Sequence, residues 1–307
     1  KASSFLVFQT VASQRETDHQ CQKSSGDGEI NEIHEFPFRI ELIGPFMLGK
    51  GPSKNSKKGR RADKGLIKMG AAARKYGGSR AHAGAPARAS AMTSHPMIPS
   101  ATTQLLLCLS PDWDAPSGHL QRFERAAFDT WQPVGDEIPV ALGRSGMAWG
   151  RGLHPPTGGL EKCEGDGRVP AGVFAITALF GYADASALPA APRLPYHRAR
   201  PDLKCVDDPA SAHYNGLVDG AAQPRDWASC EDMLRQDGRY ALGAVVAHNS
   251  TPPVPGAGSC IFLHVWESPA TPTAGCTAMA LAHMRDIALW LDGARAPLLV
   301  QLPEAEF

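Results

Sequence analysis

The chain has 307 residues, of which 43% are hydrophobic, enough for a folded core. Its formal net charge is zero, but the charge is unevenly spread: residues 50–88 hold seven Lys and five Arg against one acid, Asp63. No apolar run reaches the ~18 residues of a membrane-spanning helix, so no transmembrane segment is predicted. The seven cysteines lack the regular spacing of a small disulfide scaffold and include no CxxC pair. These features indicate a globular protein with a basic segment.

Residues 1–101 are predicted to be a disordered, basic, low-complexity extension. The stretch 50–88 is rich in Gly, Ala and Ser, and it cannot bury enough apolar surface to offset its ordering entropy. Such a tail could bind nucleic acid or anionic envelope polymers, but we expect a solvated extension and no nucleic-acid partner. Residues 4–12 lack the basic flank and cleavage site of a signal peptide, so no clear signal peptide is predicted.

Residues 102–307 are predicted to form one folded domain. Residues 120–131 fit either a helix or a strand, and 183–232 are irregular, as expected of a lid or insertion. Residues 280–291 carry apolar side chains at helical spacing, and Gly293 is the predicted C-cap of this helix. Many short strands with one helix predict a mainly β (α+β) fold. Strands are predicted at 104–109, 138–142, 172–180, 241–248, 260–266 and 297–302.

Cys276 and His264 form the candidate catalytic pair. The sequence predicts His264 near the end of a strand and Cys276 directly before the helix. A helix N-terminus lowers the pKa of a thiol, and its free N–H groups can hold an oxyanion. Gly275 allows the close backbone approach that this needs, and a nearby His264 would complete a thiolate–imidazolium pair. The alternative is a buried cysteine beside a core histidine.

A metal site is the rival use of the same residues. Cys260 and His264 share a strand face but lie about 13 Å apart at the usual rise per residue. That separation is too long for one ion bound at ~2.1–2.3 Å. We therefore expect no metal, and no cofactor is predicted.

Two further pairs of residues and three cysteines are candidates for a role in local structure or in the active-site groove. The His248-Asn249 pair either lines the active-site groove or forms a structural turn, and Asp166 and Arg168 are expected to fix a turn by an ion pair. A disulfide among Cys163, Cys205 and Cys230 is a further possibility, because all three lie in turn-rich sequence.

His264 is followed by a loop and then by Thr273-Ala274-Gly275-Cys276. Residues 164–174 hold an acidic, Gly-rich turn and a strand entry, and residues 143–146 hold the turn before it. These three blocks come in the order of the L,D-transpeptidase catalytic domain (YkuD family) and resemble its catalytic motif, its Thr-Pro-x-Gly-x-Phe strand entry and the preceding turn, over residues 102–303. Two positions depart from the family pattern. Ala274 stands where the family usually has His, and Ala278 stands where it usually has Arg.

The resemblance implies a β-sandwich-like or barrel-like domain that acts on peptidoglycan stem peptides in the cell envelope or periplasm. Cys276 would form a thioester with the peptide, His264 would move the proton, and the N–H groups of Gly275 and Cys276 would stabilise the oxyanion. An L,D-carboxypeptidase-type hydrolase and a non-catalytic cell-wall-binding module are the alternatives, and we expect a monomer. The expected substrate-binding residues are Thr273, Thr277, His248, Asn249 and Ser259.

Overall fold

A computed structural model describes residues 98–126 and 130–307. The α-helix of this part of the chain is α2 (Leu281–Trp290), and short 3-10 helices lie at Ala185–Ala187, Gly293–Arg295 and Glu304–Glu306. The strands are β1 (Gln104–Ser110), β2 (Ser117–Arg125), β3 (Trp131–Ala141), β4 (Met147–Trp149), β5 (Val169–Gly181), β6 (Tyr196–Arg198), β7 (Leu203–Val206), β8 (Leu217–Asp219), β9 (Cys230–Asp232), β10 (Leu242–Val246), β11 (Phe262–Val265), β12 (Thr277–Met279) and β13 (Leu298–Pro303).

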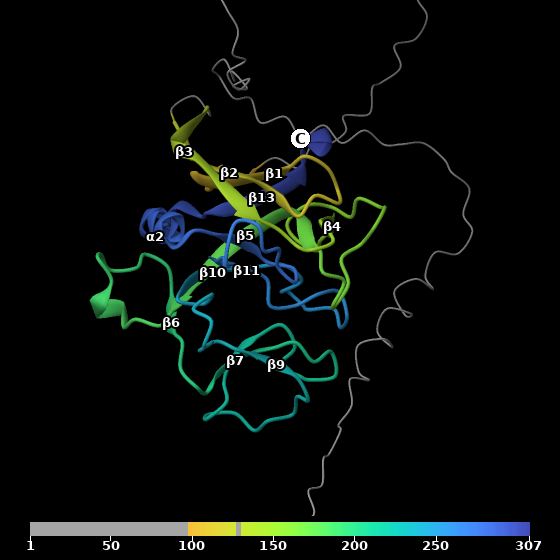
Figure 1. Ribbon diagram of the computed structural model, residues 1–307, viewed down its shortest axis with the longest axis vertical. Coiled ribbons are helices and arrows are strands. Elements are labelled where there is room, and N and C mark those ends of the chain that lie inside the picture. Colours follow the sequence, from red (N-terminus) through yellow and green to blue (C-terminus); the bar gives the residue numbers. More distant parts are fainter. Residues whose placement is uncertain (1–97, 127–129) are drawn as a thin grey trace, which may run out of the picture. The chain divides into compact units, whose positions relative to one another are not determined.

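Eight of these strands close into a mixed β-barrel (Figure 1). The order is β10-β11-β12-β3-β2-β1-β13-β5, and pairing of β5 with β10 closes the ring. The pairs β1–β13 and β11–β12 are parallel, whereas the other neighbours in the ring are antiparallel. The prediction of a mainly β fold is confirmed, and closure removes the edges that an open sheet would expose.

The barrel interior is filled by side chains that alternate along the strands. In β2, Leu120 and Phe123 are both fully buried although they are three residues apart, and both belong to the main hydrophobic core. The register of β2 with β3 shifts between Leu120 and Arg122 because β3 has two extra residues there, whereas the register of β2 with β1 is regular. Strands β1 and β13 are buried along almost their whole length, as their continuous apolar sequences predict.

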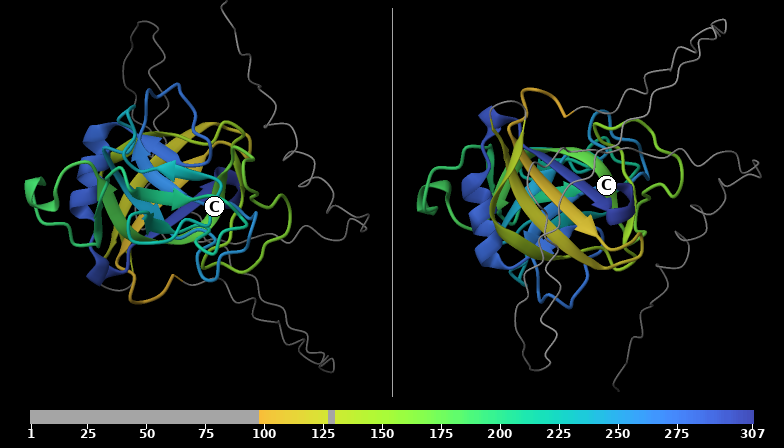
Figure 2. Two further views of the ribbon diagram at one scale, coloured as in Figure 1. Left: turned by 90° about the horizontal axis from the view of Figure 1, so that it is seen from below. Right: turned by 90° about the horizontal axis from the view of Figure 1, so that it is seen from above.

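Helix α2 runs along one side of the barrel (Figures 1 and 2). Met284, Ile287 and Leu291 are fully buried in the core, which confirms the helical periodicity read from the sequence. The prediction that Gly293 caps the helix is wrong. The helix ends at Trp290 and its C-cap is Leu291, whose N–H donates to the Ile287 carbonyl. Gly293 begins a 3-10 turn whose N-cap is Asp292.

The segment 183–232, expected to be irregular, contains four short strands. Strand β6 pairs with β5 of the barrel, and β8-β7-β9 form a separate three-stranded sheet (Figure 1). A disulfide between Cys205 on β7 and Cys260 joins this sheet to the residues that lead into β11. These strands are three or four residues long, too short to show a period in the sequence.

The ambiguous stretch 120–131 contains the end of β2 and the start of β3. Most of the expected extension, residues 1–97 of 1–101, lies outside the described residues. Within residues 98–126 and 130–307, no helix has the length and apolar character needed to cross a membrane.

Candidate active site

Strands β11 and β12 bring His264 and Cys276 into one region of the barrel wall. The two strands form a parallel pair in which His264 is opposite Ala278, and Cys276 directly precedes β12. The prediction that Cys276 lies directly before the helix is wrong, because β12 lies between them and α2 begins only at Leu281. Ala278 pairs with His264 on one side and with Ala141 of β3 on the other, so distant partners hold this segment extended.

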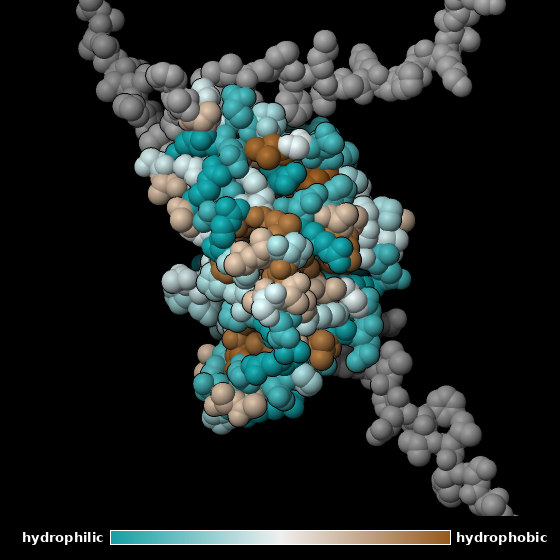
Figure 3. Space-filling view, turned by 90° about the vertical axis from the view of Figure 1, so that its left-hand side faces the viewer, coloured by the Kyte–Doolittle hydropathy of each residue, from teal (hydrophilic) through white to brown (hydrophobic). Residues whose placement is uncertain are grey.

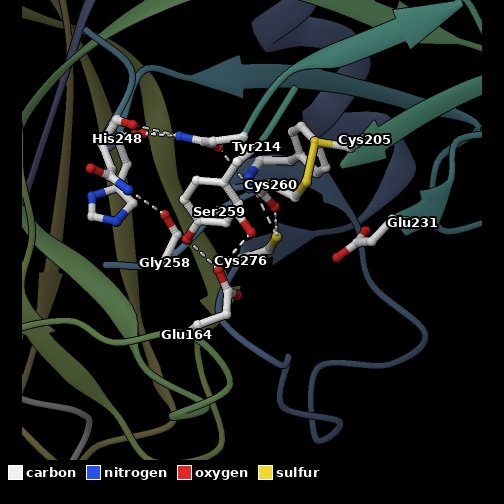
Figure 4. The surroundings of a disulfide bond; sticks show 12 residues. Glu164, Cys205, Tyr214, Glu231, His248, Gly258, Ser259, Cys260 and Cys276 are labelled. Atoms are coloured by element: carbon white, nitrogen blue, oxygen red, sulfur yellow. Dashed lines mark hydrogen bonds between the residues drawn. A yellow bond between two sulfur atoms is a disulfide. The ribbon is translucent and has the colours of Figure 1, made fainter. Parts of the chain in front are cut away.

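The Cys276 sulfur lies between backbone groups rather than at a helix N-terminus. The Phe262 N–H donates to Sγ at 3.3 Å, and the thiol donates to the Cys260 carbonyl at 3.5 Å (Figure 4). The residue is only 8% exposed. Burial, aided by the negative charge of Glu231, raises the pKa of the Cys276 thiol to about 12, although the Phe262 N–H acts in the opposite direction. The resting side chain is therefore a neutral thiol.

His264 is also buried and neutral. Its Nδ1 lies 2.8 Å from the Val265 carbonyl, which can only accept, so Nδ1 carries the hydrogen and Nε2 is left as the base. Burial lowers the pKa of His264 to about 4 despite that hydrogen bond, and the ring of Tyr240 packs edge-on against the imidazole at 5.4 Å. Among the described residues, His264 makes no hydrogen bond with Cys276 Sγ. The resting pair is therefore thiol and imidazole, not the expected thiolate–imidazolium pair.

The turn before Cys276 is held by Thr273. Its hydroxyl donates to the Cys276 carbonyl at 2.6 Å and accepts the Gly275 N–H at 3.2 Å. The backbone of Thr273 bonds Leu142 and Arg144, at the turn that follows β3. The segment 273–276 and the turn at 143–146, which are separate blocks in the sequence, are thus adjacent in the fold.

Gly275 lies against a loop formed by the 164–174 block. A Cβ atom at this position would be 3.1 Å from the Arg168 carbonyl and 3.9 Å from Lys162 Nζ. The expected ion pair between Asp166 and Arg168 is wrong. Asp166 pairs instead with the buried Lys162 at 2.5 Å and accepts the Arg168 N–H, while the Arg168 guanidinium pairs with Asp114 at 3.0 Å.

A pocket of about 140 Å³ contains both His264 and Cys276. Thr273 is the member of the predicted substrate-binding set that lines it. The full lining is Glu231, Arg235, Arg239, Tyr240, His264, Trp266, Glu267, Thr271, Pro272, Thr273, Ala274, Cys276 and Ala278.

One wall of this pocket was not predicted from the sequence. Glu231 lies on β9, and Arg235, Arg239 and Tyr240 come from the connection between β9 and β10. No known motif marks these residues. The available signal is the closely spaced charges of residues 235–239 directly before a strong strand, a pattern that also fits a solvated turn.

His248 and Asn249 hold the loop that precedes Cys260. The Arg151 N–H donates to His248 Nδ1 at 3.2 Å, and Nε2 therefore donates to the Ala257 carbonyl at 2.9 Å. Burial lowers the pKa of His248 to about 3. The Asn249 amide donates to the Gly258 carbonyl at 3.0 Å. The polar atoms of both residues are engaged within the protein, and neither residue lines the pocket described above.

Ser259 and Thr277 also bond to protein groups. The hydroxyls of Ser259 and Tyr214 both donate to one carboxylate oxygen of Glu164, at 2.7 and 2.6 Å (Figure 4). Thr277 donates to Gln301 at 2.6 Å within the buried part of the barrel. These contacts fix the backbone on either side of the Cys276 pocket.

The disulfide at the site differs from the one considered from the sequence. Cys205 pairs with Cys260, whereas Cys230 is a free thiol, so the disulfide considered among Cys163, Cys205 and Cys230 is wrong in each of its possible pairings. The Cys260 N–H donates to Asn215 Oδ1 at 2.9 Å. Residues of the inserted segment thus hold Cys260, whose carbonyl accepts from Cys276.

Comparison with known families gives one result. The family model of the L,D-transpeptidase catalytic domain (YkuD) matches residues 120–300. A comparison with curated proteins found no match. The matched range includes His264, Cys276 and all of the pocket residues named above.

Proposed function

We propose, because the chain belongs to the L,D-transpeptidase catalytic domain family, that it is a cysteine acyltransferase acting on peptidoglycan stem peptides. The reaction would proceed through a thioester on Cys276. The observation that carries this proposal is the pocket that Cys276 shares with His264, whose Nε2 is the free base of the imidazole. A nucleophile and a base open to the same small cavity are what acyl transfer requires.

The first half-reaction would form the thioester. When the peptide enters the pocket, the Cys276 thiol passes its proton to His264 Nε2, and the thiolate attacks the carbonyl of the L-to-D peptide bond. The C–S bond forms, the C–N bond breaks, and the leaving amine takes the proton from His264. Because the resting thiol is bonded to the Cys260 carbonyl, it must turn toward the imidazole for this step.

The turn at Gly275 would provide the oxyanion site. Backbone N–H groups of Gly275 and Cys276 are the candidate donors, and such donors typically contribute several kcal/mol to acyl transfer. In the resting structure the Gly275 N–H is bonded to the Thr273 hydroxyl at 3.2 Å. A developing oxyanion would compete for that hydrogen, and Thr273 would remain in place through its bond to the Cys276 carbonyl.

The substrate contacts are proposed on the same basis. Thr273 lines the pocket and is the best-supported of them. Contacts from Thr277, His248, Asn249 and Ser259 stay predictions, and their observed bonds support a role in fixing the pocket walls. The family acts on peptidoglycan in the cell envelope, and for this chain we propose the same compartment.

Acylation of Cys276 is the direct test. Carbapenems acylate cysteine nucleophiles of this type, so incubation with a carbapenem should add the mass of one drug molecule to the intact protein. Cys276→Ala should abolish the adduct, whereas Cys230→Ala, which removes a different free thiol, should retain it. A protein that forms no adduct and gives no thioester with a stem tetrapeptide would refute the acyltransferase proposal and favour a non-catalytic wall-binding module.

Products then identify the reaction type. A stem tetrapeptide with an amine acceptor should yield a cross-linked product detected by mass spectrometry. If the thioester forms but only the shortened peptide appears, the protein is an L,D-carboxypeptidase-type hydrolase.

A further inference from the structure

Glu231 brings to the Cys276 pocket a negative charge that has no ion-pair contact among the described residues. The inserted sheet carries it there on β9, and Figure 4 shows its carboxylate pointing from that strand toward Cys276. Its carboxylate accepts a hydrogen bond from the Tyr240 hydroxyl, a neutral donor. Within the part of the chain that the structure describes, Glu231 has no ion-pair partner.

The two arginines of the pocket do not supply that partner, because each has a carboxylate of its own. Arg235 forms a double hydrogen bond with Asp237, with a shortest contact of 2.6 Å. Arg239 pairs with Glu267 and lies 3.4 Å from Asp237. The two arginines are therefore each paired with a nearby carboxylate. Glu231 is the carboxylate of this wall that has no such pair among the described residues.

Among the described residues, the Glu231 carboxylate has a phenol as its hydrogen-bond partner and no ion pair. Arg235, which is paired with Asp237, acts on it only from a distance and lowers its pKa by less than burial raises it. Such a carboxylate is costly to bury. Glu231 is also fixed in direction by Tyr240, whose ring packs against His264. A pre-oriented carboxylate facing a nucleophile's pocket is a binding site for a cationic group. We propose that Glu231 binds the amine of the acceptor and takes its first proton. This inference rests on the proposed acyltransferase function.

The acceptor enters as an ammonium ion and gives one proton to the Glu231 carboxylate, becoming a free amine. Its nitrogen attacks the thioester carbonyl, the C–N bond forms, and a second proton passes to His264 Nε2. The C–S bond breaks, the Cys276 thiolate takes the proton from His264, and the third hydrogen remains on the new amide. Glu231 then releases its proton to water.

The electrostatics of the pocket are consistent with this role. Burial raises the pKa of Glu231 above its ordinary value, and Asp207 and Glu164 add to the effect, so the carboxylate is a stronger base than an exposed one. The negative charge of Glu231 also contributes to the raised pKa of Cys276. A cation bound at Glu231 would oppose that contribution and favour the thiolate.

Binding to Cys276→Ala tests the site without any chemistry. The probe is a stem tetrapeptide with a free side-chain amine, and its comparison is the same peptide with that amine acetylated. We expect the free amine to bind about tenfold more tightly, the size expected of one hydrogen-bonded charge contact. Adding Glu231→Gln should remove the preference, since the amide can still accept from Tyr240 but carries no charge. Asp232→Asn is the matched control, because this neighbouring exposed carboxylate pairs with Lys204, and it should retain the preference. Equal binding of both peptides to Cys276→Ala would overturn the proposal.

Partitioning of the thioester tests the catalytic part. In the protein with Cys276 intact, Glu231→Gln should lower the ratio of amine transfer to hydrolysis about tenfold, and the lost transfer should recover at high pH, where the acceptor is already a free amine. An unchanged ratio, or a loss that alkaline pH does not rescue, would contradict the role as proton acceptor. A protein that never forms the thioester would refute the proposed function, while the binding comparison would still decide whether Glu231 recognises an amine.

Discussion

The Cys276 sulfur is held between the Phe262 N–H and the Cys260 carbonyl and is protonated in the resting protein. Because its pKa is raised to about 12, the thiolate fraction should increase about tenfold per pH unit up to that value. We expect the rate of iodoacetamide labelling of Cys276 to follow this rise from pH 7 to 11. Peptide mass spectrometry resolves Cys276 from the partly exposed Cys230 in the same sample. A rate that levels off at or below pH 9 would show that the thiol is not shielded as described.

Residue identity predicted that Cys276 and His264 would lie together, but not the protonation state of either side chain. Thr273-Ala274-Gly275-Cys276 and His264 are recognisable because their spacing is local, and the structure brings both side chains to one pocket. Their pKa values depend on burial by groups from other segments, which no local pattern reports. Glu231 and Tyr240 were missed for the same reason, since Glu231 reaches the site on the inserted sheet and Tyr240 reaches it from the connection between β9 and β10.

The inserted sheet is an element that a covalent link joins to the barrel, in addition to hydrogen bonds such as that from the Cys260 N–H to Asn215. The Cys205–Cys260 disulfide joins β7 to the residues before β11 and closes a loop with a sequence separation of 55. A bridge of this kind typically adds 2–4 kcal/mol to the free energy of unfolding. Replacing both cysteines with Ser should therefore lower stability by about 2–4 kcal/mol in urea unfolding. Cys230→Ser is the matched control in the same sheet and should have a much smaller effect. Equal losses of unfolding free energy in the two variants would mean that the disulfide does not itself stabilise the fold.

Elements with a strong local pattern were predictable, and those made by distant pairing were not. Helix α2 follows from the spacing of Met284 and Ile287, and β1 follows from its apolar run. Strand β12 has three residues and exists because β11 and β3 flank it. Its sequence looked like the start of the helix that follows, and this error placed Cys276 at a helix N-terminus.

At the scale of the whole molecule, the barrel buries two histidines in neutral form. The pKa of His264 is lowered to about 4 and that of His248 to about 3, in both cases mainly by burial. The unfolded chain binds protons at these side chains near pH 6.5, whereas the folded chain does not until the pH is much lower. The stability that these two histidines contribute by staying neutral is therefore fully present above about pH 6.5, and it is lost as the pH falls toward 4.

His264→Asn isolates one part of this acid sensitivity. Each buried histidine contributes up to about 1.4 kcal/mol per pH unit to the slope of the unfolding free energy in this window. We expect the variant to lose stability less steeply between pH 6.5 and 4 than the parent, by up to that amount. Urea unfolding at several pH values measures both slopes, and values at pH 8, where both histidines are neutral, separate the packing cost of the substitution from the titration. Carboxylates contribute equally to both proteins, so parallel curves would show that His264 is not buried as a neutral base.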